Sequence, residues 1–318
     1  MHNLPIGPYH PALKEPASFV LEVEGEEIVG AKYDLGYNHR GIEKFAVGKE
    51  ATKILFLSER VCGICSQAHS SCYCYAFEKI FDAEISERAD MIRTVLAEVA
   101  RMHNHLFALG LIGYQIGFKS LFMWCWDLRE EPLAIIEKFC GNRYHSAINR
   151  IGGVRYDISN SAKSKMEKRL EKMKKKLSGI EEFFDTPIVR ARLCNLARLS
   201  KKDAKKIGVV GPMARGSGVA IDERTGYGPY DDMEFSMVVG SKGDAMERSL
   251  VRLREIRKSI EMVQKTDLPK GELCVKFKPK RGKARFAVEA PRGRNFHVVK
   301  TDGKKIESLS INPFLISC

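Results

Sequence analysis

The sequence predicts a mainly α protein of the α+β class, in which a helical bundle carries a small N-terminal β-hairpin and short C-terminal β-strands. Three observations predict this class. Residues 18–34 contain two runs of β-forming residues around Glu24-Gly25-Glu26, which is a hairpin pattern. Apolar residues recur at helical spacing through the centre of the chain. Short strand patterns return only after residue 270.

The predicted bundle begins at about residue 48. Residues 92–118 are apolar on more than one face, which predicts a helix buried among other helices. Residues 163–177 are rich in lysine and place Met166, Leu170, Met173 and Leu177 on one face. We therefore expect an amphipathic helix whose lysines face water.

The second half of the chain alternates loop, helix and strand. The Gly-rich passage at 209–230 predicts a loop, and such loops commonly serve function. A helix is predicted over about 231–265, followed by strands at 273–277, 284–291 and 295–303. We expect one domain over 1–318, composed of an N-terminal β element (1–47), a helical bundle (48–266) and a C-terminal β segment (267–318).

The net charge is +13, from 53 Lys and Arg against 40 Asp and Glu. Such an excess suits an anionic membrane surface, an acidic partner or nucleic acid. Nucleic acid is disfavoured because no reader fold or interleaved aromatic pattern accompanies the charge. The sequence has neither an uninterrupted apolar stretch of about 18 residues nor a secretory pattern at its start. These features predict a cytoplasmic chain without a membrane span of its own.

Nine cysteines at irregular positions fit metal ligation better than a disulfide framework. The segment ERVCGICSQAH at 59–69 places Cys62 and Cys65 three residues apart, so both sulfurs can converge on one metal. Arg60 could hold nearby sulfur ionised, and His69 could donate a hydrogen bond to a bound thiolate.

A lone C-x-x-C also occurs in zinc half-sites and in thioredoxin-like redox pairs. A zinc site needs two more ligands, and the sequence has no second C-x-x-C and no H-x-x-H. A thioredoxin-like pair expects a βαβ setting, which this helical region does not offer. We expect Cys72 and Cys74 to be buried core thiols.

The segment ERVCGICSQAH resembles the first cysteine motif of nickel-iron hydrogenase large subunits. Further segments resemble the membrane-associated, energy-converting branch of that family and follow its order along almost the whole chain. These segments are GPYHP at 7–11 with LKEP at 13–16, LGYNHRGIEK at 35–44, GPMARGSGV at 211–219 and EAPRG at 289–293.

The resemblance implies a nickel ion held by four thiolates, two of which bridge to an iron that carries small diatomic ligands. Cys62 would be a terminal nickel ligand and Cys65 a bridging ligand. Soft sulfur donors suit a redox-active metal that must bind hydride. The implied reaction is the reversible oxidation of dihydrogen to protons and electrons.

Two further catalytic residues are implied by the resemblance. Glu15 matches the proton-relay carboxylate of the family, against the alternative of a salt-bridged surface glutamate. Arg292 matches the arginine near the diatomic ligands of iron, where a guanidinium offers fixed donors and positive charge. Pro291 would hold Arg292 by fixing the backbone. Without the resemblance, Pro291 and Arg292 would simply indicate a turn.

Three residues are expected to support the site rather than to react. His69 would donate a hydrogen bond to a cysteine sulfur, with an ordinary buried histidine as the alternative. Arg215 and Asp222, in the Gly-rich loop, are expected to hold the site in shape.

The family's second cysteine motif, Asp-Pro-Cys-x-x-Cys, does not occur in this sequence. The tail at 301–318 resembles the segment that precedes that motif, so Cys318 is not expected to replace either ligand. We first expect a truncated or frame-shifted product. The alternatives are a chain completed by a separate polypeptide, and a relative that has abandoned hydrogen chemistry.

Two other functions remain open. One is the quinone-site subunit of respiratory complex I, which shares segments with this chain but lacks the cysteines and has a histidine where Lys14 stands. The other is a non-catalytic scaffold that docks an iron-sulfur subunit. The hydrogenase resemblance implies an iron-sulfur small subunit and ion-translocating membrane subunits as partners. The chain would then be attached peripherally to the membrane through them.

Overall fold

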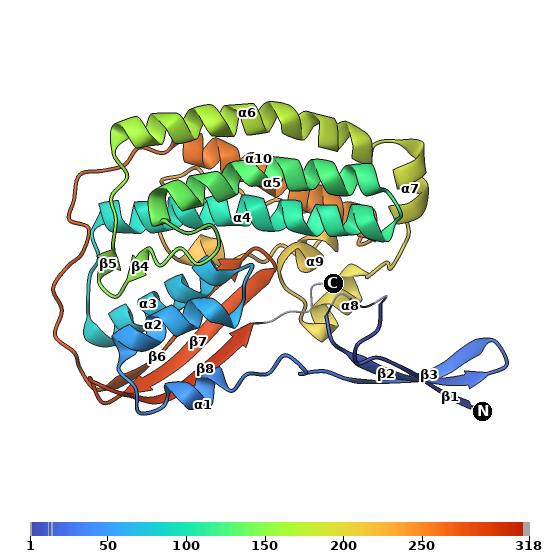
Figure 1. The fold of residues 1–318 in the computed structure, drawn as a ribbon, viewed down its shortest axis with the longest axis horizontal. Helices are drawn as coiled ribbons and strands as arrows, with labels where there is room; N and C mark the ends of the chain where they lie inside the picture. The colour runs from blue at the N-terminus through green and yellow to red at the C-terminus, as the bar shows by residue number, and fades with distance from the viewer. Residues whose placement is uncertain (1, 12, 14, 314–318) are drawn as a thin grey trace. The chain divides into compact units, whose positions relative to one another are not determined.

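The computed structural model describes residues 2–11, 13 and 15–313. The chain divides into two compact units, Met1–Ile42 and Glu43–Cys318. The predicted class is confirmed, since a helical bundle lies between two small sets of strands in the chain order (Figure 1). Among the described residues, no helix is long and apolar enough to span a membrane.

The N-terminal unit is an antiparallel sheet of three strands in the order β1-β2-β3. The predicted hairpin forms its β2–β3 half, where Gly25 takes a φ of +62° that favours glycine at the turn. Strand β1 was not predicted. The strands are β1 (His2–Ile6), β2 (Ser18–Glu24) and β3 (Glu27–Asp34).

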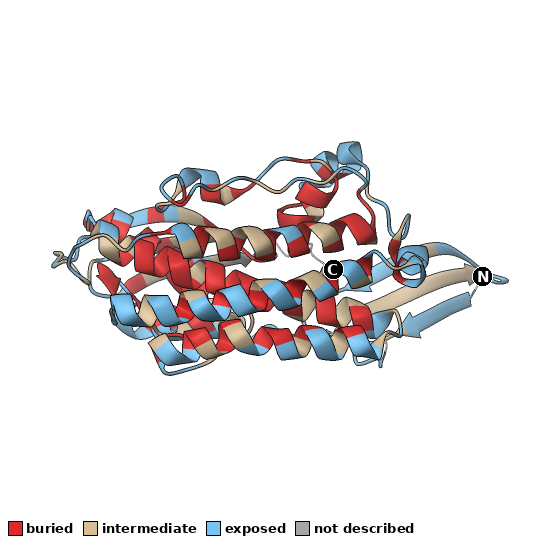
Figure 2. Cartoon of the chain, turned by 90° about the horizontal axis from the view of Figure 1, so that it is seen from above, coloured by how far each residue is buried: buried red, intermediate tan, exposed pale blue. Residues whose placement is uncertain are grey.

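The larger unit is built around four long helices that pack side by side (Figure 1). Buried residues recur along them as stripes (Figure 2), as expected for helices that share one core. The four are α4 (Glu87–Gln115), α5 (Lys119–Cys140), α6 (Asn160–Phe184) and α10 (Ala245–Lys265).

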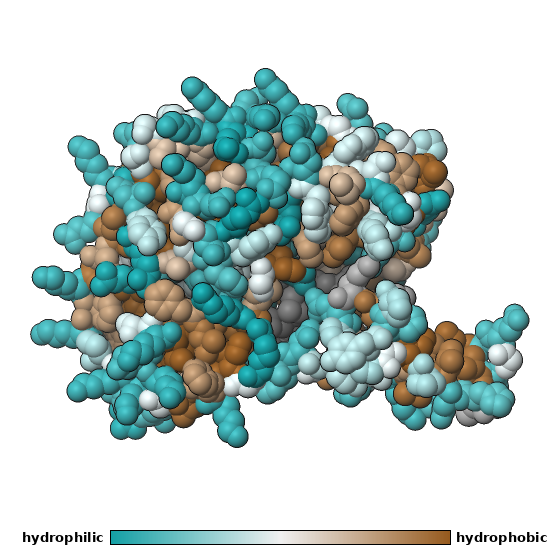
Figure 3. All heavy atoms as spheres, viewed as in Figure 1, coloured by the Kyte–Doolittle hydropathy of each residue, from teal (hydrophilic) through white to brown (hydrophobic). Residues whose placement is uncertain are grey.

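Helix α6 shows how the sequence pattern produces this packing. Ser159 caps its first turn by accepting a hydrogen bond from the Ala162 N–H at 3.3 Å. Met166, Leu170 and their predicted partners are buried in the helical core. The opposite face carries lysines, and hydrophilic side chains cover this edge of the molecule in Figure 3. The amphipathic helix is therefore confirmed, although it extends beyond the predicted range of 163–177.

A second layer connects the bundle to the C-terminal sheet. Helix α3 (Ser66–Phe81) packs on strands β6 (Gly282–Ala290) and β7 (Gly293–Thr301), and β8 (Ile306–Pro313) completes this antiparallel sheet. The remaining elements are short. They are α1 (Ile42–Ala46), α2 (Ala51–Ser58), η1 (Glu59–Val61), β4 (Asn149–Arg150), β5 (Gly153–Val154), α7 (Pro187–Leu193), α8 (Lys201–Ile207), α9 (Gly211–Gly216) and η2 (Glu223–Gly226).

Three predicted elements differ in the structure. The helix predicted from 231 begins at Ala245, because Gly243 has a φ of +70° and lies so close to Leu199 that a Cβ would be 2.1 Å from its carbonyl oxygen. The passage 209–230 contains α9 and η2 and is not loop throughout. Residues 273–277 form a single bridge, Gly153 to Cys274, and no strand.

Candidate functional site

Cys62 and Cys65 lie on the bend between η1 and the start of α3. Cys65 is buried and Cys62 is half-buried. The backbone N–H groups of Ile64 and Cys65 donate to the Cys62 sulfur at 3.4 and 3.3 Å. The bend thus holds one sulfur of the pair in a set of donors that favours a thiolate.

The pKa values of the two thiols are shifted in opposite directions. A hydrogen bond from the Cys65 side chain, together with the backbone donors and the positive charge of Arg292, lowers the pKa of Cys62 to about 6. The same hydrogen bond, together with burial, raises the pKa of Cys65. At neutral pH the pair therefore has one thiolate and one thiol, and we call it the thiol pair.

Arg292 reaches the thiol pair from the turn between β6 and β7. Ala290 pairs with Gly293 across the hairpin, so Pro291 and Arg292 form a two-residue turn. Helix α9 begins directly against this turn: a Cβ on Gly211, whose φ is +66°, would be 2.4 Å from the Arg292 carbonyl oxygen. Glycine is required there, and this contact brings the GPMARG and EAPRG segments together.

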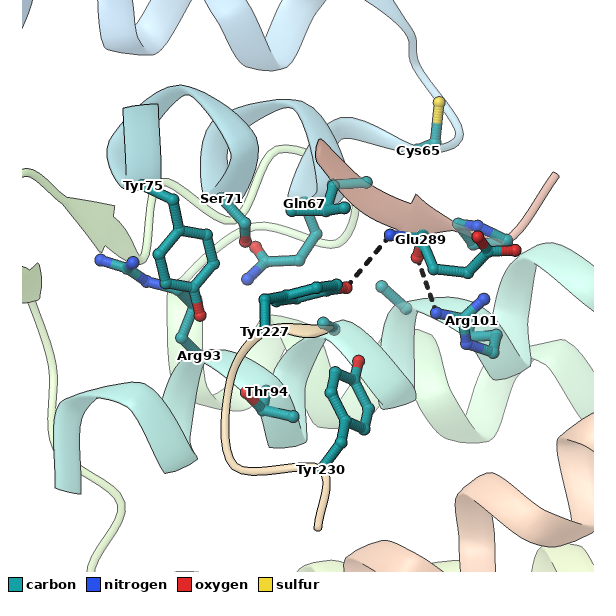
Figure 4. Close-up of a pocket in the computed structure, with 15 residues that line it drawn as sticks. Cys65, Gln67, Ser71, Tyr75, Arg93, Thr94, Arg101, Tyr227, Tyr230 and Glu289 are labelled. Carbon is teal, nitrogen blue, oxygen red and sulfur yellow. Dashed lines mark hydrogen bonds between the residues drawn. The ribbon is translucent and has the colours of Figure 1, made fainter. Parts of the chain in front are cut away.

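A small buried cavity lies between α3, α4, β6 and the segment that follows η2 (Figure 4). Its volume is about 20 Å³, which is room for about one water molecule. Cys65, Arg101, Tyr227, Glu289 and Pro291 are among its lining residues. The Glu289 N–H donates to the Tyr227 hydroxyl at 3.2 Å, and Arg101 Nη2 donates to the Glu289 carbonyl oxygen at 2.8 Å.

A network of buried ion pairs adjoins this cavity. Arg215 is fully buried and contacts Glu255 and Glu289 at 2.8 Å each and Asp222 at 3.0 Å. Arg224 binds Asp222 at 2.7 Å. Glu98 contacts Arg101 at 3.1 Å and Arg224 at 3.4 Å, and also accepts hydrogen bonds from Tyr230 and Ser259. We call these residues the Arg215 network.

The carboxyl groups of the network differ in acid strength. Burial alone would raise the pKa of Glu255 and Asp222. Nearby guanidinium groups, and for Glu255 also the hydrogen bond with His105 at 2.7 Å, hold both pKa values below their usual range. For Glu98, Arg101 and Arg224 outweigh burial in the same way. Burial instead raises the pKa of Glu289 to about 7, with a further contribution from the Asp222 charge and against the attraction of Arg215.

The other predicted residues are placed as follows. Arg60 donates to the Phe56 carbonyl oxygen at 2.6 Å. His69 Nδ1 lies 3.2 Å from His297 Nε2 and 3.3 Å from Asn295 Nδ2, and burial lowers the pKa of His69 to about 4. The expected bond from His69 to a cysteine sulfur stays a prediction. Glu15 belongs to the N-terminal unit, whereas the thiol pair belongs to the larger unit, and its role as a proton relay stays a prediction.

Sequence reasoning missed most of the Arg215 network. Glu98, Arg101 and Glu255 lie in long helices, where charged residues usually face water. The signal was available in α4: charged residues in a helix that is apolar on several faces must be buried and therefore paired. Cys72 and Cys74 are buried, as expected, and Cys72 donates to the Phe286 carbonyl oxygen at 3.2 Å.

The described residues do not by themselves complete a nickel-iron centre. Across 2–11, 13 and 15–313, no three His, Cys, Asp or Glu side chains form a group that could hold a metal ion. The thiol pair supplies two sulfur donors where a closed site of this kind needs four. Cys318 and Lys14 lie outside the described residues.

Comparison with known proteins identifies the family. Residues 115–278 match the family of the 49 kDa subunit of respiratory-chain NADH dehydrogenase, and residues 40–109 match the nickel-dependent hydrogenases. The chain is 34% identical to the membrane-bound hydrogenase subunit alpha of Pyrococcus furiosus over 94% of this chain and 75% of that one. It is 35% identical to the carbon monoxide-induced hydrogenase of Rhodospirillum rubrum, over 95% of this chain and 86% of that one.

A solved structure agrees with these matches. A chain of the membrane-bound sulfane sulfur reductase, an archaeal respiratory membrane complex, superposes with a TM-score of 0.90 at 30% identity. The superposition covers 98% of this chain and 87% of that chain. The resemblance inferred from the cysteine motif and the EAPRG segment is therefore confirmed. The protein belongs to the oxidoreductase family that unites the nickel-dependent hydrogenase large subunits with the 49 kDa subunit of respiratory-chain NADH dehydrogenase.

Proposed function

We propose that this chain is the large subunit of an energy-converting hydrogenase complex that oxidises dihydrogen reversibly to two protons and two electrons. The observation that carries the proposal is the thiol pair at the start of α3, held beside Arg292. Cys62 and Cys65 would supply two sulfur ligands of a nickel-iron centre. The remaining ligands would come from outside the described residues.

The surrounding residues have matching roles in this proposal. Arg292 would place a fixed positive charge beside the metal ligands, and Pro291 would hold its backbone in the hairpin turn. Glu15 would carry protons away from the site. Arg215 and Asp222 would keep β6 and α9 in position. An iron-sulfur small subunit would take the electrons, and ion-translocating membrane subunits would attach the complex to the cytoplasmic side of a membrane.

The metal content of the purified native complex tests this proposal. We expect stoichiometric nickel together with iron, and hydrogen uptake with an artificial electron acceptor. Cys65→Ser should lose both nickel and uptake, because it removes a sulfur ligand. Cys194→Ser is the matched control, since Cys194 packs against the helical core after α7. Background nickel, or a Cys65→Ser variant with full nickel and uptake, would refute the proposal.

A second candidate function is favoured by the two-thiol donor set. The structural relative is a sulfane sulfur reductase by name. Two thiols that close to a disulfide release two electrons and two protons, which is the amount needed to convert one sulfane sulfur to hydrogen sulfide. The Cys62 thiolate would take the sulfane sulfur from its carrier, which leaves as a thiolate, and so become a persulfide. The Cys65 thiol would then form the disulfide with Cys62, and the transferred sulfur would leave as hydrogen sulfide. Electrons from the small subunit would reopen the disulfide.

The same purified complex separates the two candidates. Sulfane sulfur reduction at background nickel, abolished by either Cys62→Ser or Cys65→Ser, would support the thiol chemistry. Its absence at background nickel would exclude that candidate too.

A further inference from the structure

The ion pairs of the Arg215 network are not one to one. Within the described part of the chain, its ion pairs join three arginines to four carboxyl groups. They are Arg101, Arg215 and Arg224, against Glu98, Asp222, Glu255 and Glu289. All seven are buried. Buried Arg252 also acts on Glu255, and His105 Nε2 lies 2.7 Å from the same carboxylate. Glu255 is therefore well compensated, and the carboxyl groups that compete for positive charge are those around Arg215.

The contacts of Arg215 identify which carboxyl groups compete. Its Nη1 atom carries two hydrogens. It donates to the Ile221 carbonyl oxygen at 3.0 Å and to Glu289 Oε1 at 2.8 Å, while Asp222 Oδ2 lies 3.0 Å from the same nitrogen. Two carboxyl groups therefore share one nitrogen, a geometry in which both cannot easily be ionised. Asp222 also has Arg224 at 2.7 Å, which leaves Glu289 as the weaker acid.

Of the network's members, Glu289 is also the nearest in sequence to Arg292, the arginine that acts on Cys62. It is the second-last residue of β6, two residues before Pro291, and it lines the small cavity together with Cys65. Arg101 lines the same cavity, and its Nη1 is buried without a hydrogen-bond partner among the described residues. A water molecule in the cavity would accept a hydrogen bond from Arg101 Nη1. It would also lie between Glu289 and Cys65, which line the same cavity.

We propose that Glu289, with Asp222 across the Arg215 guanidinium, is a proton-holding site that takes up and returns one proton beside the thiol pair. On uptake the Glu289 carboxylate becomes a neutral carboxyl, and on return the carboxylate forms again. The exchange of this proton with the thiol pair rests on the proposed function, whereas the protonation of Glu289 itself does not. Glu289 is distinct from Glu15, which lies in the N-terminal unit.

The groups that face Glu289 support a change of charge near neutral pH. Burial and the Asp222 carboxylate favour the neutral acid. Arg215 from α9, Arg101 from α4 and Arg224 from η2 favour the carboxylate. Their opposition brings the pKa of Glu289 to about 7, so the proton can be gained and lost under physiological conditions.

Infrared spectroscopy of the full chain tests the proposal without any need for a bound metal. The carbonyl stretch of a protonated carboxyl group is read in the difference between wild-type and Glu289→Gln protein. We expect this band at about pH 6 and its loss by about pH 8, because Glu289 ionises between them. The difference spectrum is needed because Glu59 and Asp90 are also buried carboxyl groups with raised pKa values.

Two variants complete the experiment. Asp222→Asn removes the like charge, so the band should titrate at lower pH. Glu78→Gln changes a buried glutamate that pairs with Arg93 and should leave the band in place. A Glu289 that stays ionised from pH 6 to 8, or a midpoint that Asp222→Asn does not lower, would overturn the proposal. Loss of hydrogen uptake at background nickel, with the band intact, would instead count against the proposed function alone.

Discussion

The larger unit buries arginine and carboxyl groups in two places that differ in how the charges are paired. Glu78 of α3 and Arg93 of α4 form a closed pair, in which Nη1 and Nη2 each donate at 2.9 Å to a separate oxygen. The Gly152 N–H also donates to Glu78 at 2.9 Å. In the Arg215 network, by contrast, Glu289 and Asp222 share one nitrogen of Arg215, at 2.8 and 3.0 Å.

The difference separates two uses of buried charge. The closed pair fixes the packing of α3 on α4, because one carboxylate occupies both terminal nitrogens of the guanidinium. A network in which two carboxyl groups share one arginine nitrogen can gain or lose a proton without breaking its other pairs. The shared nitrogen binds Glu289, which lines the small cavity together with Cys65.

The largest expected effect comes from breaking the closed pair. Arg93→Met would leave Glu78 buried with the Gly152 N–H as a donor but no positive partner. It would also remove the contact of Arg93 with the Tyr75 ring, at 4.5 Å. Loss of one partner of a buried pair costs about 3–5 kcal/mol. Urea-induced unfolding of the full chain should show a decrease of this size in the free energy of unfolding.

The matched control removes both charges. A Glu78→Leu, Arg93→Met double variant should regain much of the stability that Arg93→Met loses, because apolar replacements for a buried pair are often neutral or better. A double variant as unstable as the single one would show that lost packing, and not the unpaired charge, causes the effect.

The Glu289 carboxyl group predicts a pH-dependent effect of intermediate size. The folded state holds the Glu289 proton up to about pH 7, whereas the ordinary value is 4.5. Its contribution to stability is therefore fully present below about pH 4.5 and is lost as pH rises through about 7. Glu289→Gln has no such loss. From about pH 5 to 8, wild type should lose about 2–3 kcal/mol relative to Glu289→Gln.

Unfolding midpoints in urea at several pH values, measured side by side, check this prediction. The sign is as important as the size, since a normal salt-bridged glutamate would make wild type relatively more stable as pH rises. If the free energies of unfolding of wild type and Glu289→Gln changed in parallel with pH, Glu289 would not hold a proton near neutral pH. The proposed difference between the closed pair and the Arg215 network would then be refuted.

Much of the fold follows from the sequence because its elements are strongly periodic. The buried face of α6 and the hairpin at Gly25 were predicted from local patterns that tertiary packing reinforces. The errors occur where tertiary packing, and not the local sequence pattern, determines the secondary structure. Residues 273–277 have β-forming side chains, yet they meet β5 only at the Gly153 bridge, because strand propensity depends on the neighbouring strands available.

The site shows the same division. The thiol pair and the Pro291-Arg292 turn were identified because their chemistry is contained in a few consecutive residues. The Arg215 network joins residues from α4, α9, η2, α10 and β6, so no short segment contains it. Only the presence of Glu98 and Arg101 in an apolar helix indicated that a buried charge cluster had to exist.

The smallest effect is expected at an ion pair that water reaches. Lys176 of α6 and Asp127 of α5 are 2.9 Å apart, but their side chains are 43% and 68% exposed. Exposed pairs contribute about 0–1 kcal/mol and are screened by salt. Lys176→Ala should therefore lower the free energy of unfolding by less than about 0.5 kcal/mol, and less still at high salt.

Lys175→Ala is the matched control, since Lys175 is exposed on the same helix and has no ion pair among the described residues. Urea unfolding of both variants at low and high salt makes the measurement. If Lys176→Ala instead lost more than about 1 kcal/mol at high salt, an exposed pair would act as the Glu78–Arg93 pair is expected to act. Burial would then no longer explain the ranking of the three variants, and the lysine face of α6 would contribute to the stability of the bundle.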